Sequence, residues 1–407
     1  MNRKLPAYQA ALDEILDHVD TLPACRVPLD KALGRVLAEN VVADRDQPPF
    51  DRAAMDGFAV RSGQVQAGRT FAVCGAIAAG APLRAYPDDP GQVLRIATGS
   101  PVPAGSDSVV PNERADVQTG DMERVQFSDS IQPGDNVHRR GSDATAGQTV
   151  MARGTRLGPH HIGIAASVGA IQLEVAQLPK VSLLTSGDEV RPADTSAQCL
   201  APQQIRNSNG PMLSAFFAAA GVPHSDHQHL LDEPEQTLEG ARAALSRSQL
   251  VVTVGGVSVG QRDLLPWAWR QLDLKTIIHG VAIQPGKPLF AARGQGVLVI
   301  GLPGNPVSAL TTAHLFVWPV MRKMLGLAGA LPWRQLALAG SVKAISSRQL
   351  FRAARVLADG TAAVIDWHGS GDLMHTANAN GFARLPLVAG QVERGTPVPF
   401  LPLVAEG

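Results

Sequence analysis

The pattern of hydrophobic and polar residues changes several times along the chain. Residues 5–19 and 28–39 carry apolar side chains at helical spacing, so helices are predicted there. From about residue 46, Pro, Gly and Asp become frequent and short alternating runs appear, which is typical of a small β domain. The strands of this domain are predicted at 71–77, 92–97, 107–113 and 123–127, and a short helix is predicted at 160–170.

Residues 178–327 repeat one order of elements, in which an apolar strand is followed by a loop of small residues and then by a helix. The strand-to-loop units lie at 181–189, 250–263 and 296–316, with helices near 211–220, 235–247 and 305–325. This alternation predicts an α/β fold with a doubly wound parallel sheet, in which ligands bind at the carboxyl ends of the strands. After Pro332 the pattern returns to short strands, which predicts a terminal β-barrel.

The bulk composition argues against several classes of protein. At 407 residues, with 36 Lys+Arg and 36 Asp+Glu, the chain has room for two to four structural units but no overall positive charge that would favour nucleic acid or an anionic membrane. It has no apolar leader and no run of about eighteen apolar residues, which predicts a soluble, unexported protein. Cys25, Cys74 and Cys199 are scattered, which argues against disulfides or a zinc–cysteine site and favours the cytoplasm.

The stretch at 250–263, LVVTVGGVSVGQRD, is predicted to deliver an anion site. Its apolar half is typical of a buried parallel strand, and Gly255, Gly256 and Gly260 would let backbone N–H groups approach a phosphate. Gln261 and Arg262 stand where a nucleotide-binding P-loop needs Lys and Ser/Thr, so an ordinary NTPase is disfavoured. A tight strand-to-helix turn without a ligand remains the alternative.

The other strand-end loops combine anion-binding groups with carboxylates. Lys287, one of only seven lysines, lies in a glycine-rich loop and would hold a phosphorylated ligand together with hydroxyls such as Ser258 and Ser308. Glu189 and Asp263 would hold Mg²⁺, because acids beside a phosphate repel it unless a hard cation lies between them. Simple helix capping by these acids is the alternative.

Two further groups of polar residues have plainer interpretations. In the β domain, Asp56, Thr98 and Asp143 could face the same ligand, although Asp-Gly and Thr-Gly pairs are also ordinary turn chemistry. The histidines of HSDHQH, at 224, 227 and 229, imitate a metal cluster, but an edge strand is the better interpretation because neither a cysteine nor a fourth ligand accompanies them. A serine hydrolase is disfavoured because GxSxG is absent.

Six motifs together resemble the MoeA family of molybdopterin molybdenumtransferases, which is related to the gephyrin E domain. They are MDGFA at 55–59, ATGSPVPAG at 97–105, TSGDE at 185–189, GGVSVGQRD at 255–263, QPGKP at 284–288 and GLPGNPVS at 301–308. The resemblance is collinear and implies four parts. These are an elongated helical and extended segment (1–46 plus 140–177), an inserted β domain (47–139), a molybdopterin-binding α/β domain (178–327) and a C-terminal β-barrel (328–407).

The resemblance also implies an activity and partners. The family takes molybdate and adenylylated molybdopterin as substrates, inserts the metal and releases AMP, with Mg²⁺ as the divalent ion. A homodimer is implied, in which the α/β domain of one subunit and the inserted domain of the other share a cleft. Contacts with the molybdopterin adenylyltransferase and with molybdoenzyme chaperones are implied as well.

Site residues follow from the matching motifs, residue by residue. Catalytic positions are Asp56, Thr98, Asp143, Glu189 and Asp263. Cofactor-binding positions are Gly187, Gly255, Gly256, Ser258, Gly260, Lys287, Pro303, Gly304, Asn305, Pro306 and Ser308. Magnesium would lie on Glu189, Asp232 and Asp263, and molybdate would contact Arg352 and Ser370.

The chain departs from the family pattern at two places. An acid usual in the family is Ser142 here, and the position before PGKP, often basic, is Gln284, so a weaker positive charge is expected at the anion site. Two other functions stay open at this point: the preceding adenylyl transfer from ATP, and a gephyrin-like scaffold without turnover. Molybdate and tungstate are not distinguished.

Overall fold

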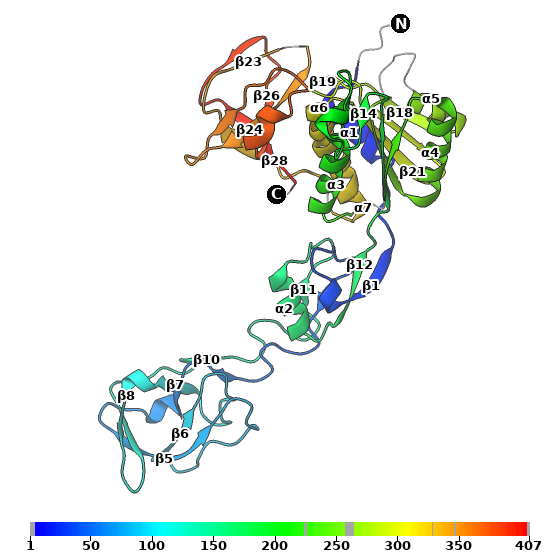
Figure 1. The fold of residues 1–407 in the computed structure, drawn as a ribbon. Helices are drawn as coiled ribbons and strands as arrows, with labels where there is room; N and C mark the ends of the chain where they lie inside the picture. The colour runs from blue at the N-terminus through cyan, green and yellow to red at the C-terminus, as the bar shows by residue number, and fades with distance from the viewer. Residues whose placement is uncertain (1–4, 224–225, 257–263, 328, 346, 405–407) are drawn as a thin grey trace.

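The computed structural model describes residues 5–223, 226–256, 264–327, 329–345 and 347–404, and the molecule is elongated (Figure 1). A β-rich unit lies at one end, a short connecting unit in the middle, and an α/β unit beside the C-terminal strands at the other end. The predicted boundaries between four domains stay a prediction. Among the described residues, no helix has both the length and the apolar character needed to cross a membrane.

The connecting unit is built from segments far apart in the sequence. β1 (Ala24–Pro28) pairs with β12 (Gln172–Ala176), β2 (Val41–Val42) pairs with β11 (Thr149–Met151), and α2 (Pro159–Ser167) packs nearby. The helix predicted at 28–39 is wrong. Only a 3-10 turn, Leu29–Lys31, forms there, because β-bridges from Val36 to Arg156 and from Leu37 to Val175 hold the following residues extended and override the local helical spacing. The helix predicted at 5–19 is confirmed as α1 (Tyr8–Leu16).

The β-rich unit is a six-stranded sheet around an aromatic core of Phe58, Phe71 and Phe127. All four strands predicted for it are confirmed. In spatial order the strands are β7 (Ser108–Pro111), β4 (Gly57–Val60), β6 (Gln92–Ile96), β5 (Thr70–Ile77), β9 (Arg124–Phe127) and β8 (Ala115–Gln118). At one end of the unit, β3 (Arg52–Ala53) pairs with β10 (Val137–His138).

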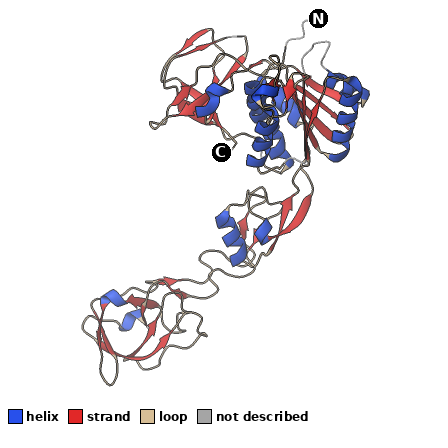
Figure 2. Cartoon of the chain, viewed as in Figure 1, coloured by secondary structure: helices blue, strands red, loops and turns tan. Residues whose placement is uncertain are grey.

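The α/β unit holds a six-stranded sheet with helices on both faces (Figure 2). Its order is β16 (Asp226–Leu230), β13 (Val181–Ser186), β17 (Leu250–Val254), β21 (Val297–Leu302), β20 (Phe290–Gly294) and β18 (Lys275–His279). The first four strands are parallel, as predicted, but β20 pairs antiparallel with both of its neighbours, β21 and β18, so the sheet is mixed. The reason is local: positive φ angles at Gln295 and Gly296 let β20 turn directly into β21 as a hairpin.

Two hydrophobic layers cover this sheet. One contains α1, α3 (Asn209–Ala219), α6 (Pro306–Thr312) and α7 (Trp318–Met324), where α6 and α7 are joined by the π-helical turn Ala313–Val317. The other contains α4 (Pro234–Arg247) and α5 (Leu264–Gln271). Because helices lie on both faces, the doubly wound arrangement is confirmed for the parallel strands. A small parallel pair, β14 (Val190–Arg191) and β15 (Ile205–Arg206), follows the first strand-end loop.

The C-terminal region forms strands, as predicted, and is joined to the α/β unit through one of them. Its main sheet runs β19 (Ile283–Gln284), β24 (Gln349–Val356), β26 (Gly381–Leu385), β28 (Pro397–Pro402) and β22 (Arg334–Ala337). β25 (Ala362–Val364) pairs with β24, and β23 (Val342–Ala344) pairs with β27 (Gly390–Val392). Closure into a barrel stays a prediction, since no pairing joins the outer strands β19 and β22 in this order.

Candidate functional site

The carboxyl ends of β13, β17 and β21 meet at one edge of the α/β sheet, as the sequence predicts. Gly255 has a φ of +87°, and a Cβ added there would lie 3.0 Å from the Ser186 carbonyl oxygen. A Cβ added at Gly304 would lie 3.6 Å from the Cα of Gly255. The three loops therefore approach one another closely, and Gly255 is required by both its backbone angle and its neighbours. Gly256 follows in the same turn, whereas Ser258, Gly260 and Asp263 lie outside the described residues.

A pocket of roughly 490 Å³ opens where the α/β unit meets the C-terminal strands. Its charged lining residues are Lys287 and Arg348, with no carboxylate among the described residues that line it. Five of the predicted residues line this pocket, namely Lys287, Pro303, Asn305, Ser308 and Ser370. Two cations with hydroxyl and amide groups and no acid make a site suited to an anion.

The loop at 284–288 forms one wall of the pocket. Gly286 has a φ of +109°, and a Cβ there would collide with the Thr312 methyl group and lie 3.0 Å from Ile283 Cδ1. The carbonyl of Lys287 accepts a hydrogen bond from the Val281 amide (2.9 Å), while its side chain is exposed. This backbone path leaves the Lys287 ammonium free to meet a ligand.

Arg348 is a pocket residue that the sequence analysis missed. β19 pairs with β24 in the register Ile283 to Gln349, which places Arg348 next to the strand that carries Gln284. The sequence predicts a weaker positive charge because Gln284 is neutral, yet Arg348 supplies a second cation to the same pocket. The only local signal is a second arginine four residues before Arg352, which does not by itself reveal the pairing.

The loop after β25 closes the other side of the pocket. Asn305 Nδ2 donates a hydrogen bond to Ser370 Oγ (2.8 Å), and the Val307 amide donates to the Ser370 carbonyl (3.1 Å). Pro306 begins α6 directly after Asn305, so this loop is docked on the start of that helix. Ser370 therefore lines the anion pocket, and its contact with molybdate stays a prediction.

Arg352 does not line the pocket. Its guanidinium carbon lies 5.2 Å from the ring centroid of Trp367, a pocket residue, and its Nη2 donates to the Ile365 carbonyl (3.1 Å). Burial lowers the pKa of Arg352, and its Nε is buried without a hydrogen-bond partner. Arg352 therefore stacks on Trp367, and it is Trp367 that lines the pocket. Direct contact between Arg352 and molybdate stays a prediction.

A second, acidic group lies at the ends of β13 and β16. Asp188 Oδ1 accepts a hydrogen bond from the Asp232 amide (3.1 Å), which joins the two loops. The pKa of Asp232 is raised by burial and by the negative charges of Asp188 and Glu189. Three carboxylates that repel one another form a donor set that a hard divalent cation would neutralise.

The segment HSDHQH was predicted to form an edge strand, and its described part does so as β16. Two histidines of this strand support the acidic loop. Thr185 Oγ1 lies 3.0 Å from both His227 Nε2 and His229 Nδ1, and it accepts a hydrogen bond from Asn207 Nδ2 (3.1 Å). His229 Nε2 lies 3.2 Å from the carbonyl oxygen of Gly187. These contacts hold the loop that carries Glu189. The first histidine of the segment, at 224, lies outside the described residues.

In the β-rich unit, Asp56 and Thr98 are brought together as predicted. Asp56 Oδ1 accepts hydrogen bonds from the Thr98 amide (2.6 Å) and from Thr98 Oγ1 (2.9 Å). These two bonds lower the pKa of Asp56, the amide bond first, so the exposed side chain is a carboxylate at neutral pH. The pair therefore presents a fixed negative charge to solvent.

Asp143 belongs to a chain of polar contacts beside this pair. Its Oδ1 lies 2.7 Å from His138 Nε2, and His138 Nδ1 lies 3.2 Å from Arg52 Nη2. Since Arg52 can only donate, His138 uses Nδ1 as acceptor and donates from Nε2 to Asp143. The sequence analysis missed His138 and Arg52, because only the β3–β10 pairing places them together.

Within one chain, the polar residues of the β-rich unit lie far from the pocket of the α/β unit. The loops at 52–56, 97–101 and 136–143 converge through backbone hydrogen bonds from Ala53 to Ser100 and from Ala54 to Asn136, both 2.9 Å. However, this unit lies at the far end of the elongated molecule from the α/β sheet (Figure 1). Asp56, Thr98 and Asp143 are therefore remote from Lys287 within one chain.

Comparisons with known proteins agree with this arrangement over nearly the whole chain. Residues 7–169 match the family model of the MoeA N-terminal region (domain I and II), and residues 182–323 match that of a probable molybdopterin binding domain. The molybdopterin molybdenumtransferase of Synechococcus elongatus is 36% identical and aligns over 96% of this chain and 98% of its own. That of Staphylococcus epidermidis is 32% identical over 93% and 91%. The crystal structure of a molybdopterin biosynthesis MoeA protein from Pyrococcus horikoshii has a TM-score of 0.85 at 27% identity, covering 98% of this chain and 100% of that one.

Proposed function

Because this chain belongs to the MoeA family of molybdopterin molybdenumtransferases, we propose that it inserts molybdate into adenylylated molybdopterin and releases AMP. The observation that carries the proposal is the pocket in which Lys287 and Arg348 are the charged lining residues. Both substrates are anions, so such a pocket attracts molybdate and the substrate's phosphates alike. The domain boundaries given above are part of the same proposal.

In this proposal the pocket cations and the loop amides act on the charge that develops during AMP release. An oxygen of water or molybdate would form a bond to phosphorus as the phosphoanhydride bond between the molybdopterin phosphate and AMP breaks, and AMP would leave with the bridging oxygen while negative charge grows on the phosphate oxygens. Lys287 and Arg348 would stabilise that charge more strongly than the charge of the bound substrate. Asn305, Ser308 and Ser370 would orient the anion by hydrogen bonds.

The acidic group fits Mg²⁺, and the proposal assigns it there. Glu189 and Asp232 would hold the ion, and Asp188 adds a third acid nearby. Asp263, which lies outside the described residues, keeps its predicted place in this ligand set. The pKa of Asp232 is raised by burial first and then by the charges of Asp188 and Glu189, and the second cause is one that a divalent cation would relieve. When bound, Mg²⁺ would neutralise the pyrophosphate oxygens next to these acids.

A shared cleft in a homodimer is also part of the proposal. Asp56, Thr98 and Asp143 lie far from Lys287 in one chain, so they can serve one cleft only if a second copy supplies them. In this arrangement the partner's β-rich unit would bring carboxylates and a hydroxyl opposite the pocket. The three free cysteines fit a cytoplasmic location, where contacts with the molybdopterin adenylyltransferase and with molybdoenzyme chaperones would supply the substrate and accept the product.

Molybdate-dependent release of AMP from adenylylated molybdopterin tests the activity. The wild-type protein should release AMP only when molybdate is present, and Lys287→Ala should lose most of that rate. Lys275→Ala, which removes an exposed lysine from the edge strand β18, is the matched control and should keep it. Glu189→Gln should also lose AMP release, and an unchanged rate would remove the acidic group from the mechanism.

Two outcomes would favour the alternatives. Formation of adenylylated molybdopterin from molybdopterin and ATP would identify the preceding adenylyl transfer as the function. Binding of substrate without any release of AMP would favour a scaffold.

A further inference from the structure

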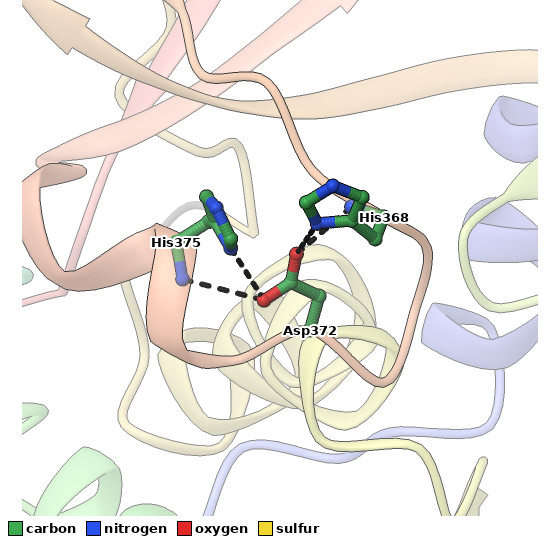
Figure 3. Close-up of side chains that lie close together, drawn as sticks. All are labelled: His368, Asp372 and His375. Atoms are coloured by element: carbon green, nitrogen blue, oxygen red, sulfur yellow. Dashed lines mark hydrogen bonds and ion pairs between the residues drawn. The ribbon is translucent and has the colours of Figure 1, made fainter.

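We propose that His368, Asp372 and His375 form a binding site for a divalent transition metal of the zinc type, separate from the acidic group proposed to hold Mg²⁺. All three come from one loop of the C-terminal region, and Figure 3 shows both imidazoles turned toward the carboxylate between them. The ligand atoms that the three side chains can offer all lie within 4.8 Å of one another. Within the described ranges, this is the one group of three or more His, Cys, Asp or Glu residues that meets this distance.

The carboxylate of Asp372 is held in place by the loop itself. Its Oδ2 accepts one hydrogen bond from the His368 amide (2.8 Å) and also lies 3.1 Å from His368 Nδ1. Its Oδ1 lies 2.7 Å from His375 Nδ1, at the start of the 3-10 turn Met374–Asn378. These contacts fix the orientation of the Asp372 carboxylate between the two imidazoles.

Exposure differs among the three side chains in the way an accessible metal site needs. Asp372 is 15% exposed, whereas His375 is 48% and His368 84% exposed. The fixed carboxylate therefore lies underneath, and the two imidazoles lie where an ion arrives from solvent. Exposed rings can rotate at little cost, which brings their nitrogens to the separation of roughly 3.4 Å expected between tetrahedral ligands about 2.1 Å from zinc.

The donor set selects the class of metal. Two imidazole nitrogens and one carboxylate oxygen suit Zn²⁺, Co²⁺ or Ni²⁺, while Mg²⁺ and Ca²⁺ prefer oxygen ligands alone. In the metal-free loop the Nδ1 atoms donate protons to Asp372, and a metal would replace those protons at the same atoms. The contacts that fold the loop thus pre-arrange the ligands.

A metal bound to this loop would affect the neighbouring anion pocket. Trp367, Gly369 and Ser370, which line the anion pocket, lie next to or between the proposed ligands in the sequence. A bound ion would fix the ends of this segment and so hold one wall of the pocket. The binding site itself does not depend on the proposed activity, because it requires only the loop.

Titration of the untagged full-length protein with Co²⁺ tests the proposal by visible absorption, with Zn²⁺ as competitor. We expect one equivalent of Co²⁺ that Zn²⁺ displaces and excess Mg²⁺ does not. His375→Ala and His368→Ala should each weaken this binding by about tenfold or more. The double variant His160→Ala, His161→Ala removes another adjacent histidine pair and should bind as the wild type does.

Three results would overturn the proposal. They are no Co²⁺ or Zn²⁺ bound by the wild type at millimolar metal, unchanged affinity in both single histidine variants, or displacement of Co²⁺ by Mg²⁺. Because Asp372 also organises the loop, the histidine variants carry the test, and circular dichroism checks that they are folded. Binding of the metal alone is measured, so failure here is distinct from failure of the AMP-release assay.

Discussion

Replacing Gly286 with alanine should disable the anion pocket by straining the loop that carries Lys287. The φ of +109° costs an L-residue about 1–2 kcal/mol, and the collision of the new Cβ with Thr312 and Ile283 adds about 1–3 kcal/mol of overpacking. The loop can relieve this total destabilisation of about 2–5 kcal/mol only by leaving its present conformation. At the lower value the pocket-competent conformation, and with it the apparent affinity, falls about 30-fold.

The second-site variant Thr312→Ser separates the two contributions. Serine removes the colliding methyl group but keeps the hydroxyl that donates to the Ser308 carbonyl (2.7 Å). Gly286→Ala with Thr312→Ser should therefore recover the clash portion, about fivefold or more in kcat/KM for AMP release, while the strain in φ remains.

A glycine far from the pocket provides the control for Gly286→Ala. Gly360 has a φ of +80° and open space where an added Cβ would lie, so Gly360→Ala should destabilise the protein slightly without changing kcat/KM. Wild-type kcat/KM in Gly286→Ala, or no recovery in the double variant, would refute the role assigned to this loop.

Three further predictions address charge. Arg348→Ala should lower kcat/KM for AMP release about 10- to 150-fold, the loss expected for a hydrogen bond to a charged group, and Arg348→Lys should recover part of it; an unchanged rate would remove Arg348 from the pocket's function. The pKa of Asp232 is raised in the folded state, so the folded protein is destabilised as the pH rises through that pKa and Asp232 becomes charged. Asp232→Asn should therefore raise Tm at pH 7 in EDTA, and this gain in Tm should shrink toward pH 4. Thr98→Val removes one of the two bonds that lower the pKa of Asp56, so the acid limb of the pH–rate profile should move to higher pH; an unmoved limb would show that Asp56 does not set it.

Local patterns in the sequence predicted most elements of the fold. Period-two runs identified the strands of the β-rich unit, and the repeat of strand, loop and helix identified the parallel strands β13, β17 and β21 with their converging loops. Strand pairings between segments far apart in the sequence could not be predicted from these local patterns. Bridges from Val36 and Leu37 to Arg156 and Val175 took the place of the helix predicted at 28–39, and the β20–β21 hairpin made the sheet mixed.

The candidate site divides in the same way. Asn305 and Ser308 follow β21, so their place at the strand-end edge was predictable from topology, whereas Lys287 lies between β19 of the C-terminal sheet and β20 of the α/β sheet. Arg348 enters through the β19–β24 pairing, and Arg52 joins His138 and Asp143 through the β3–β10 pairing, and neither pairing can be recognised from the local sequence. Resemblance alone favoured Arg352 as a molybdate contact, yet that side chain is held against Trp367.

A complementation assay tests the central claim most directly, namely that the pocket of one chain works with Asp56 of another. Asp56→Asn and Lys287→Ala are each expected to be nearly inactive alone, and mixing them with subunit exchange yields heterodimers in which one cleft carries both substitutions and the other neither. With half the dimers mixed and one of their two clefts intact, molybdate-dependent AMP release should recover to about one quarter of the wild-type rate. Activity that stays at the level of the separate variants, although exchange is confirmed by mass, would contradict a cleft shared between subunits.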